Sequence, residues 1–163
     1  MRFAVNYLAG FLLTRLLLPL MRVSEPARIV NVSSLAQQPI DFDDVMLTRG
    51  YTGGLAYAQS KLAQIMFTLD LARERDRTTI TANCLHPATY MATTMVRQSG
   101  VTPVSSVEQG AEAILNLAVS KELDGHSGEF YNGLRPSRAI AQAYDVRARE
   151  RLRVLSMRLT GLA

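Results

Sequence analysis

The sequence predicts an α/β fold in which helices flank a parallel β-sheet. Two apolar, β-branched runs of strand length, residues 28–34 and 79–85, stand on either side of a stretch, 55–75, whose apolar residues recur with helical spacing. This separation suits a right-handed βαβ crossover, which joins two parallel strands. With 163 residues, 48% of them hydrophobic and 20% charged, the chain has the composition of a single globular domain, 1–163.

The opening segment, residues 3–21, is expected to be a buried helix with apolar residues on several sides. Its composition is close to that of a signal peptide or a membrane span. However, Asn6, Thr14 and Arg15 interrupt the apolar run and no small-residue cleavage site follows, so we expect neither a leader nor a membrane span. From the residues alone, Asn6 is either a buried amide with local hydrogen bonds or part of a site.

The first strand-like run is typical of a central parallel strand and ends at Ser33 and Ser34. Ligands of open α/β sheets bind beyond the carboxyl ends of the strands, so these hydroxyl groups are candidates for a site. The alternative is that both serines only form a turn. Residues 35–56 then have the composition of a loop, in which the acids at 41–44 indicate a solvated turn and the glycines match no phosphate-binding pattern.

Tyr57 and Lys61 stand four residues apart at the start of the helical stretch and therefore share one helix face. A nearby cation favours the phenolate form of a tyrosine and lowers its pKa, which would let Tyr57 serve as a general acid or base. The alternative is an exposed helix face that carries a tyrosine and a lysine without any chemical role.

The same helical stretch carries two apolar stripes, and a helix must bury both. One stripe is predicted to cover the sheet. The other indicates a subunit interface, so we expect a homo-oligomer. The first stripe consists of Leu62, Ile65, Met66 and Leu69, and the second consists of Ala63, Phe67 and Leu71.

The remainder of the chain predicts a helix at 108–119, a short strand at 129–131 and an arginine-rich final helix at 139–157. Acidic residues are interspersed with these arginines and the net charge is +4, so we expect no nucleic-acid partner. Two distant histidines without companion cysteines give no metal-ligand spacing, so we expect no metal site. A single cysteine, Cys84, fits a reducing compartment and predicts a cytoplasmic protein.

Four short motifs follow one another along the chain. They are Asn6 within Val-Asn-Tyr-Leu-Ala-Gly, the Val-Asn-Val-Ser-Ser run that ends at Ser34, Tyr57-x-x-x-Lys61, and the His-Pro-Ala-Thr run that starts at His86. In this order they resemble the short-chain dehydrogenase/reductase family, and the long segment between Ser34 and Tyr57 is similar to that of its retinol-dehydrogenase-like branch. The resemblance covers the whole chain and implies the C-terminal part of a Rossmann-like, doubly wound parallel sheet with flanking helices.

The resemblance implies an enzyme that interconverts a carbonyl and an alcohol in a small-molecule substrate, with hydride transfer to or from NAD or NADP. It implies that Tyr57 handles the proton, that Lys61 holds the nicotinamide ribose, that Ser34 orients the substrate oxygen and that Asn6 supports a proton relay. The implied catalytic residues are Asn6, Ser34, Tyr57 and Lys61, and the implied cofactor-binding residues are Tyr57, Lys61, Pro87, Ala88 and Thr89. Ala88 departs from the glycine that the family has at that position.

A complete dinucleotide-binding sheet has about six parallel strands, a Gly-rich turn after the first strand and an acidic residue that reads the ribose. The 163 residues predict about three strands and neither of the other two features. We therefore expect an incomplete NAD(P)-binding domain. Two functions stay open: an NAD(P)-dependent oxidoreductase, or a truncated, non-catalytic remnant that acts only through helix-mediated association.

Overall fold

The computed structural model describes residues 1–24, 26–74 and 80–162. In this part of the chain a four-stranded sheet has the order β1-β2-β3-β4. Strands β1 (Ala27–Val32), β2 (Ile80–His86) and β3 (Phe130–Asn132) are parallel, and β4 (Arg135–Ser137) runs antiparallel to β3. The predicted α/β fold with a parallel sheet is confirmed. The strand predicted at 79–85 corresponds to β2, although residue 79 lies outside the described residues.

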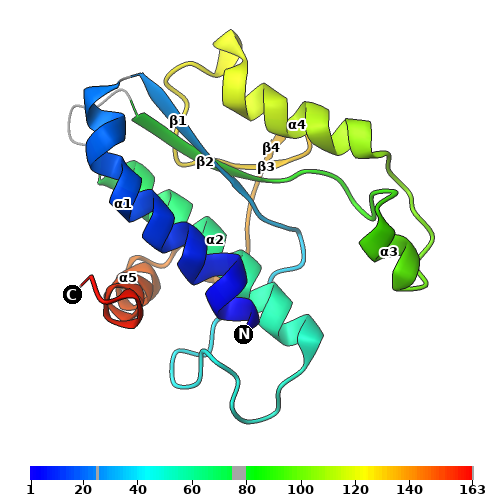
Figure 1. Cartoon of the computed structure of the whole chain (residues 1–163), viewed down its shortest axis with the longest axis horizontal. Coiled ribbons are helices and arrows are strands. Elements are labelled where there is room, and N and C mark those ends of the chain that lie inside the picture. Colours follow the sequence, from blue (N-terminus) through cyan, green and yellow to red (C-terminus); the bar gives the residue numbers. More distant parts are fainter. Residues whose placement is uncertain (25, 75–79, 163) are drawn as a thin grey trace.

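Helices cover both faces of the sheet (Figure 1). On one side lie α1 (Ala9–Val23), α2 (Gly53–Arg73) and α5 (Val146–Thr160), and on the other side lies α4 (Val107–Val119). A π-helical turn, η1 (Ala4–Leu8), leads directly into α1. The shorter elements are α3 (Thr94–Gln98) and the 3₁₀ turns η2 (Lys121–Leu123) and η3 (Ala141–Tyr144).

The unit β1–α2–β2 is the predicted crossover, and it fixes where a site can form. Val32 at the end of β1 is level with Leu85 near the end of β2, so the carboxyl ends of both strands meet at one edge of the sheet. The amino end of α2 is capped by Thr52, whose Oγ1 accepts a hydrogen bond from Leu55 N at 3.2 Å. A crossover helix runs back along the sheet, so the first turns of α2 lie beside these strand ends, where ligands bind in open α/β sheets.

Both apolar stripes of α2 are buried within the chain. The ring centroid of Phe67, in the second stripe, lies 6.3 Å from that of Tyr7 and 5.0 Å from that of Phe11. Leu152 of α5 belongs to the same apolar core cluster. The opening helical segment and α5 therefore cover the stripe that indicated a subunit interface. The homo-oligomer stays a prediction, but α2 no longer supports it.

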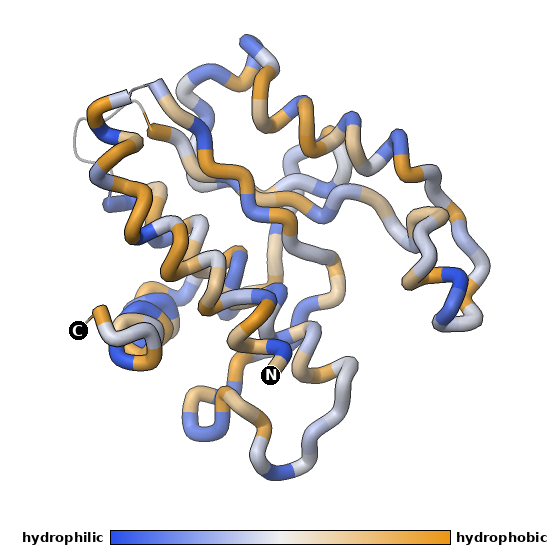
Figure 2. The backbone as a smooth tube through the Cα atoms, in the orientation of Figure 1, coloured by the Kyte–Doolittle hydropathy of each residue, from blue (hydrophilic) through white to orange (hydrophobic). Residues whose placement is uncertain are grey.

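The opening helix is buried along one face only, which corrects the prediction that its apolar residues are buried on several sides. Phe3, Tyr7 and Phe11 face α2 and are at most 4% exposed. Leu13 and Leu20 are 59% and 63% exposed. Figure 2 shows hydrophobic residues recurring along the whole of α1. The helix therefore presents an apolar face that nothing in the described part of the chain covers.

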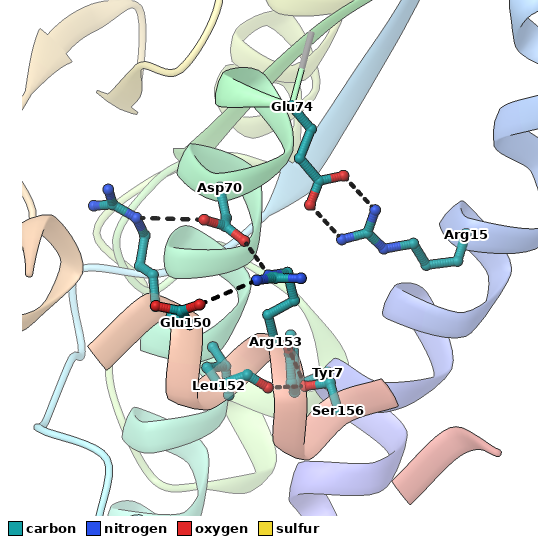
Figure 3. Close-up of polar contacts among 9 residues, drawn as sticks. Tyr7, Arg15, Asp70, Glu74, Glu150, Leu152, Arg153 and Ser156 are labelled. Atoms are coloured by element: carbon teal, nitrogen blue, oxygen red, sulfur yellow. Dashed lines mark hydrogen bonds and ion pairs between the residues drawn. The ribbon is translucent and has the colours of Figure 1, made fainter. Parts of the chain in front are cut away.

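One helical stretch among the described residues, Ala4–Val23, is long and apolar enough to cross a membrane by length and composition alone. Within this stretch Tyr7, Leu8 and Phe11 are buried. Near its middle, Arg15 pairs with Glu74, the residue that caps the carboxyl end of α2 (Figure 3). This ion pair and the aromatic face hold the stretch against the rest of the domain.

Two features near the carboxyl terminus differ from the sequence prediction. The prediction has no counterpart of β4, which forms a hairpin with β3 through Gly133 at a φ of 60°. The final helix begins at Val146 and not at residue 139, because Asp145 caps it. The Asp145 carboxylate accepts hydrogen bonds from Arg147 N at 2.8 Å and Ala148 N at 3.2 Å.

The two edges of the sheet differ. In the described part of the chain β1 pairs with β2 alone, so the backbone groups on its other side have no strand partner. At the opposite edge, β4 is three residues long and contains Pro136, which cannot donate a backbone hydrogen bond. Another strand could therefore pair with the free edge of β1 more readily than with that of β4.

Candidate active site

Asn6 connects the opening helical segment to the first turns of α2. Its side-chain Nδ2 donates a hydrogen bond to Ser60 Oγ at 3.0 Å, and Ser60 Oγ donates to the backbone oxygen of Tyr57 at 2.7 Å. Asn6 lies in the π-helical turn η1, a distortion that occurs frequently at functional sites. The structure therefore ties Asn6 to the turn that carries Tyr57.

Lys61 follows Tyr57 by one helical turn, and its ammonium Nζ lies 5.6 Å from the centroid of the Tyr57 ring. Nζ donates hydrogen bonds to the backbone oxygen of Val32 at 2.9 Å and to Gln64 Oε1 at 3.0 Å. Burial lowers the pKa of Lys61, because desolvation disfavours the charged ammonium. The two side chains share one face of α2, as their spacing predicts.

Gln64 completes the connection back to Asn6. Its Nε2 donates a hydrogen bond to the backbone oxygen of Asn6 at 2.8 Å, while its Oε1 accepts from Lys61. Neither Gln64 nor Ser60 is among the site residues predicted from the sequence. A signal for Gln64 does exist, because it follows Tyr57 by seven residues, or about two helical turns, and so lies on the same face.

Ser34 lies at the carboxyl end of β1 and is 7% exposed. Its Oγ accepts a hydrogen bond from Ala36 N at 3.1 Å, which is the turn-forming role that serines after a strand often have. Its neighbour Ser33 donates from Oγ to the backbone oxygen of Lys61 at 2.7 Å and so fixes the strand end to α2. No hydrogen bond in the described chain joins Ser34 to Tyr57. The structure thus links Asn6, Tyr57 and Lys61 and leaves Ser34 at the adjacent strand end.

The predicted cofactor-binding segment follows β2 at the same edge of the sheet. His86 Nε2 and Thr89 Oγ1 are 3.0 Å apart, and their hydrogen bond closes a turn around Pro87 and Ala88. Burial lowers the pKa of His86. Gly133 N donates to the backbone oxygen of His86 at 2.8 Å, which ties the segment to the β3–β4 hairpin. Pro87 is buried and Thr89 is exposed, so the segment turns outwards from the strand end.

The acids at 41–44 form a turn in which Asp44 is buried, and this corrects the prediction of a fully solvated one. The Asp44 carboxylate accepts hydrogen bonds from Thr48 N at 2.8 Å and Arg49 N at 2.9 Å. In the residues that the structure describes, no group of three or more histidine, cysteine, aspartate or glutamate side chains could hold a metal ion. The Asp44 carboxylate is therefore bound by backbone N–H groups of its own loop and has a structural role.

A second polar cluster lies at the other end of α2, between α1 and α5 (Figure 3). Arg15 makes two hydrogen bonds to the carboxylate of Glu74. Asp70 faces Arg149 at 3.8 Å and Arg153 at 3.6 Å. Four of these residues line a surface hollow of about 410 Å³. Each charge there faces a charge of opposite sign, which is typical of a structural cross-link between helices.

Comparison with known proteins places these residues in a family. The profile of the short chain dehydrogenase family matches residues 2–103. Human retinol dehydrogenase 13 is 39% identical over 99% of this chain, and human retinol dehydrogenase 12 is 35% identical over 97% of it. The alignments cover 54% and 53% of those proteins, so the chain spans about half the length of the curated relatives it matches.

Solved structures agree with the sequence matches. An uncharacterised protein from Mycobacterium paratuberculosis aligns with a TM-score of 0.72 at 27% identity, covering 98% of this chain and 58% of that one. Carbonyl reductase Sniffer of D. melanogaster has the same fold, with a TM-score of 0.59 at 21% identity over 85% of this chain and 55% of its own. By its sequence and its α/β fold, the chain belongs to the short-chain dehydrogenase family.

Proposed function

We propose that this chain is the catalytic part of an NAD(P)-dependent oxidoreductase that interconverts a carbonyl and an alcohol. The observation that carries the proposal is Tyr57 one helical turn before a half-buried Lys61, with both turns tied by hydrogen bonds to Asn6. Membership of the short-chain dehydrogenase family supports the same reaction class. Because relatives are named retinol dehydrogenases, retinol is among the alcohols to test.

In this proposal Tyr57 gives a proton to the carbonyl oxygen during reduction and takes it from the alcohol during oxidation. The Lys61 ammonium lies beside the Tyr57 ring and places a positive charge near the reacting groups. Asn6 holds both turns of α2 in place through Ser60 and Gln64. Ser34 would orient the substrate oxygen by donating its O–H, which the hydrogen bond accepted from Ala36 N leaves unused.

Bound NAD or NADP would supply or accept the hydride, and the residues present fit the nicotinamide half of such a coenzyme. The ammonium of Lys61 has three N–H bonds, and in the described chain two of them have acceptors. One N–H is thus available for a ribose hydroxyl. The backbone of Pro87, Ala88 and Thr89 is the candidate for holding the nicotinamide carboxamide, because it leaves the same edge of the sheet.

A chimera tests the proposal. The part of human retinol dehydrogenase 13 that this chain does not match would be joined to residues 1–163, in the order of that protein. We expect the chimera to reduce aldehydes or ketones, or to oxidise retinol, with consumption of NADPH, NADH or their oxidised forms followed by absorbance. A folded chimera that binds coenzyme and turns over none of the panel contradicts the proposal.

The chain by itself should bind the coenzyme poorly. The pyrophosphate of a dinucleotide lies against a helix N-terminus above a Gly-rich turn, and the sequence contains no such motif. Loss of those contacts should weaken the dissociation constant from micromolar towards millimolar, a change of about 4 kcal/mol. Calorimetric titration measures this directly, and a micromolar constant for NAD or NADP would show that another segment of this chain holds the pyrophosphate.

The exposed face of α1 favours a second candidate, a protein that acts through association. Leu13, Leu16 and Leu20 are 59%, 59% and 63% exposed on this face. Burial of such leucines against a second copy of the chain would stabilise a homo-oligomer. Sedimentation velocity should then show an oligomer that Leu16→Glu dissociates. A wild-type chain that stays monomeric at high concentration would contradict this candidate.

A further inference from the structure

Gln64 bridges a side-chain cation and a backbone carbonyl that belong to different helices. Its Oε1 accepts from Lys61 Nζ at 3.0 Å, and its Nε2 donates to the backbone oxygen of Asn6 at 2.8 Å. The side chain is half-buried, and its own backbone oxygen accepts from Thr68 Oγ1 at 2.8 Å. Both ends of the amide are thus occupied by partners of the correct hydrogen-bonding type.

On the basis of the proposed function, we infer that Gln64 is a positioning residue that holds the Lys61 ammonium at the end of β1 by linking it to the backbone carbonyl of Asn6. Lysine is a flexible four-carbon stem with a compact charge, so its head needs fixed acceptors to stay in one place. Val32 O provides one acceptor and Gln64 Oε1 provides the other. The remaining N–H then has a defined direction.

The chemistry of the bridge requires an amide. An amide offers an acceptor oxygen and a donor nitrogen, whereas a carboxylate only accepts and an aliphatic side chain does neither. The amide orientation follows from the partners, since a flipped Gln64 would turn its NH₂ group towards the ammonium and its oxygen towards the carbonyl of Asn6. Leucine at this position therefore removes both halves of the bridge, whereas glutamate keeps the acceptor for Lys61 and removes only the donor to Asn6.

Asn6 gains a second role from this bridge. Its side-chain amide reaches Tyr57 through Ser60, and its backbone carbonyl reaches Lys61 through Gln64. One residue in the π-helical turn thus sets the positions of two consecutive turns of α2. A merely structural cross-link between the two helices would need no contact with the ammonium.

The groups around the ammonium are neutral. On α2 they are the Tyr57 ring and the Gln64 amide, and on β1 the backbone carbonyl of Val32. In the described part of the chain no carboxylate forms an ion pair with Lys61. The protonation equilibrium of Lys61 is therefore sensitive to the one side-chain oxygen that accepts from it.

The test uses the purified chain and needs neither coenzyme nor turnover. The sequence contains two lysines, Lys61 and Lys121, so a chain labelled with ¹³C at the lysine Cε gives two signals. The titration of Lys61 is followed by NMR as the pH rises, and exposed Lys121 serves as the internal standard. Gln59→Leu is the matched control, because Gln59 is a buried glutamine of α2 that bonds to Pro39 O at 2.8 Å and not to Lys61.

Gln64→Leu should move the titration of Lys61 to lower pH, because the ammonium loses a hydrogen-bond acceptor. Gln64→Glu should move it to higher pH, because a carboxylate favours the charged ammonium. Lys121 should titrate as in the wild type in both variants, and Gln59→Leu should leave both lysines unchanged. If Gln64→Leu leaves the Lys61 titration where it is, the inference is wrong.

Gln64→Glu keeps the test decisive if Gln64→Leu does not fold, since a Lys61 titration that fails to rise in the glutamate variant also overturns the inference. The result is separate from the proposed function. If the Lys61 titration shifts as expected and the chimera is inactive, the Gln64 bridge is supported and the proposed reaction is rejected. If the chimera is active and the Lys61 titration does not shift, the reaction is supported and the bridge is rejected.

Discussion

The two ends of α2 are both cross-linked to the opening helix, but in different ways. At the amino end, Asn6 and Gln64 hold a single cation, Lys61, through neutral amide groups and backbone oxygens. At the carboxyl end, Arg15 is paired with Glu74, and two arginines of α5 face Asp70 (Figure 3). In the described part of the chain Lys61 has no counter-ion, whereas the arginines at the other end face an equal number of carboxylates, because Arg153 also pairs with Glu150.

The protonation equilibria follow this difference. Burial lowers the pKa of Lys61, whereas the hydrogen bond to Glu74 raises the pKa of Arg15. Burial also raises the pKa of Asp70, although Arg149 and Arg153 face it, because those ion pairs are 3.8 and 3.6 Å long and do not replace the lost water. A balanced cluster stabilises the fold, and an unbalanced cation is available for a ligand.

Tyr7 and Tyr57 also differ in this way, because one lies in the apolar core and the other lies beside the Lys61 ammonium. Tyr7 is 2% exposed, its hydroxyl lies 2.7 Å from Ser156 Oγ, and burial raises its pKa. Tyr57 is half-buried and stands one turn before Lys61. The same substitution, tyrosine to phenylalanine, should therefore affect stability at one position and activity at the other.

The largest expected effect is that of Tyr57→Phe. In the active chimera this variant should lower carbonyl reduction by about 10²- to 10⁴-fold, the usual contribution of a general acid or base. Coenzyme binding and the free energy of unfolding should change little, because the ring and its packing remain. Initial rates at saturating coenzyme provide the measurement. Activity within tenfold of the wild type would show that Tyr57 is not the proton donor.

Tyr7→Phe should have the opposite profile. The Ser156 hydroxyl donates to Leu152 O at 2.7 Å, so the Tyr7 hydroxyl is the donor to Ser156, and its loss should cost about 1 kcal/mol of unfolding free energy. Urea unfolding of the chain measures this cost. Tyr51→Phe, at a tyrosine that is 54% exposed, is the matched control and should change stability by less than about 0.5 kcal/mol.

Glu74→Gln should destabilise the chain by about 0.5 kcal/mol at low ionic strength, since the carboxylate is partly exposed. The effect should shrink in high salt, because mobile ions screen the charges of the wild-type pair. Unfolding curves at two salt concentrations test this expectation. An effect that does not depend on salt would mean that the side chain acts through packing and not through its charge.

The smallest expected effect is a gain in stability from Lys61→Met. The pKa of Lys61 is lower in the folded chain than its ordinary value of 10.5, so the unfolded chain binds more protons in the window between the two values. Wild-type stability therefore rises with pH across that window. The methionine variant should be the more stable at neutral pH and should lose this advantage as the pH approaches 10.5. Thermal unfolding at several pH values checks both parts.

Elements with strong periodicity could be predicted from the sequence, and locally capped or polar ones could not. The helix predicted at 55–75 is α2, Gly53–Arg73, because two apolar stripes define it. The start of α5 was placed too early, since the cap at Asp145 lies within a polar, arginine-rich stretch. The β3–β4 hairpin had a readable signal in Gly133, because glycine at the first central position favours a tight two-residue hairpin turn.

The site divides in the same way. Helical spacing alone brings Tyr57 and Lys61 to one face, and the resemblance to a family adds Asn6 and Ser34, whose roles stay predictions. Helical spacing also places Gln64 on this face, but its link to Asn6 could not be predicted, because the partner is a backbone carbonyl 58 residues away. Backbone atoms carry no sequence signature. Only the packing of the opening helix against α2 brings that carbonyl within reach.

The open edge of β1 has a consequence for the handling of the protein. The backbone groups that have no strand partner among the described residues can template a strand from another chain, and proline or a short, charged strand is what normally prevents this, as at β4. The exposed leucines of α1 add an apolar surface on the same molecule. Heterologous pairing of that kind forms an open filament wherever the rotation between neighbouring chains does not close a ring. We therefore expect concentrated preparations to aggregate, with scattered light rising steeply with concentration and with sulfate.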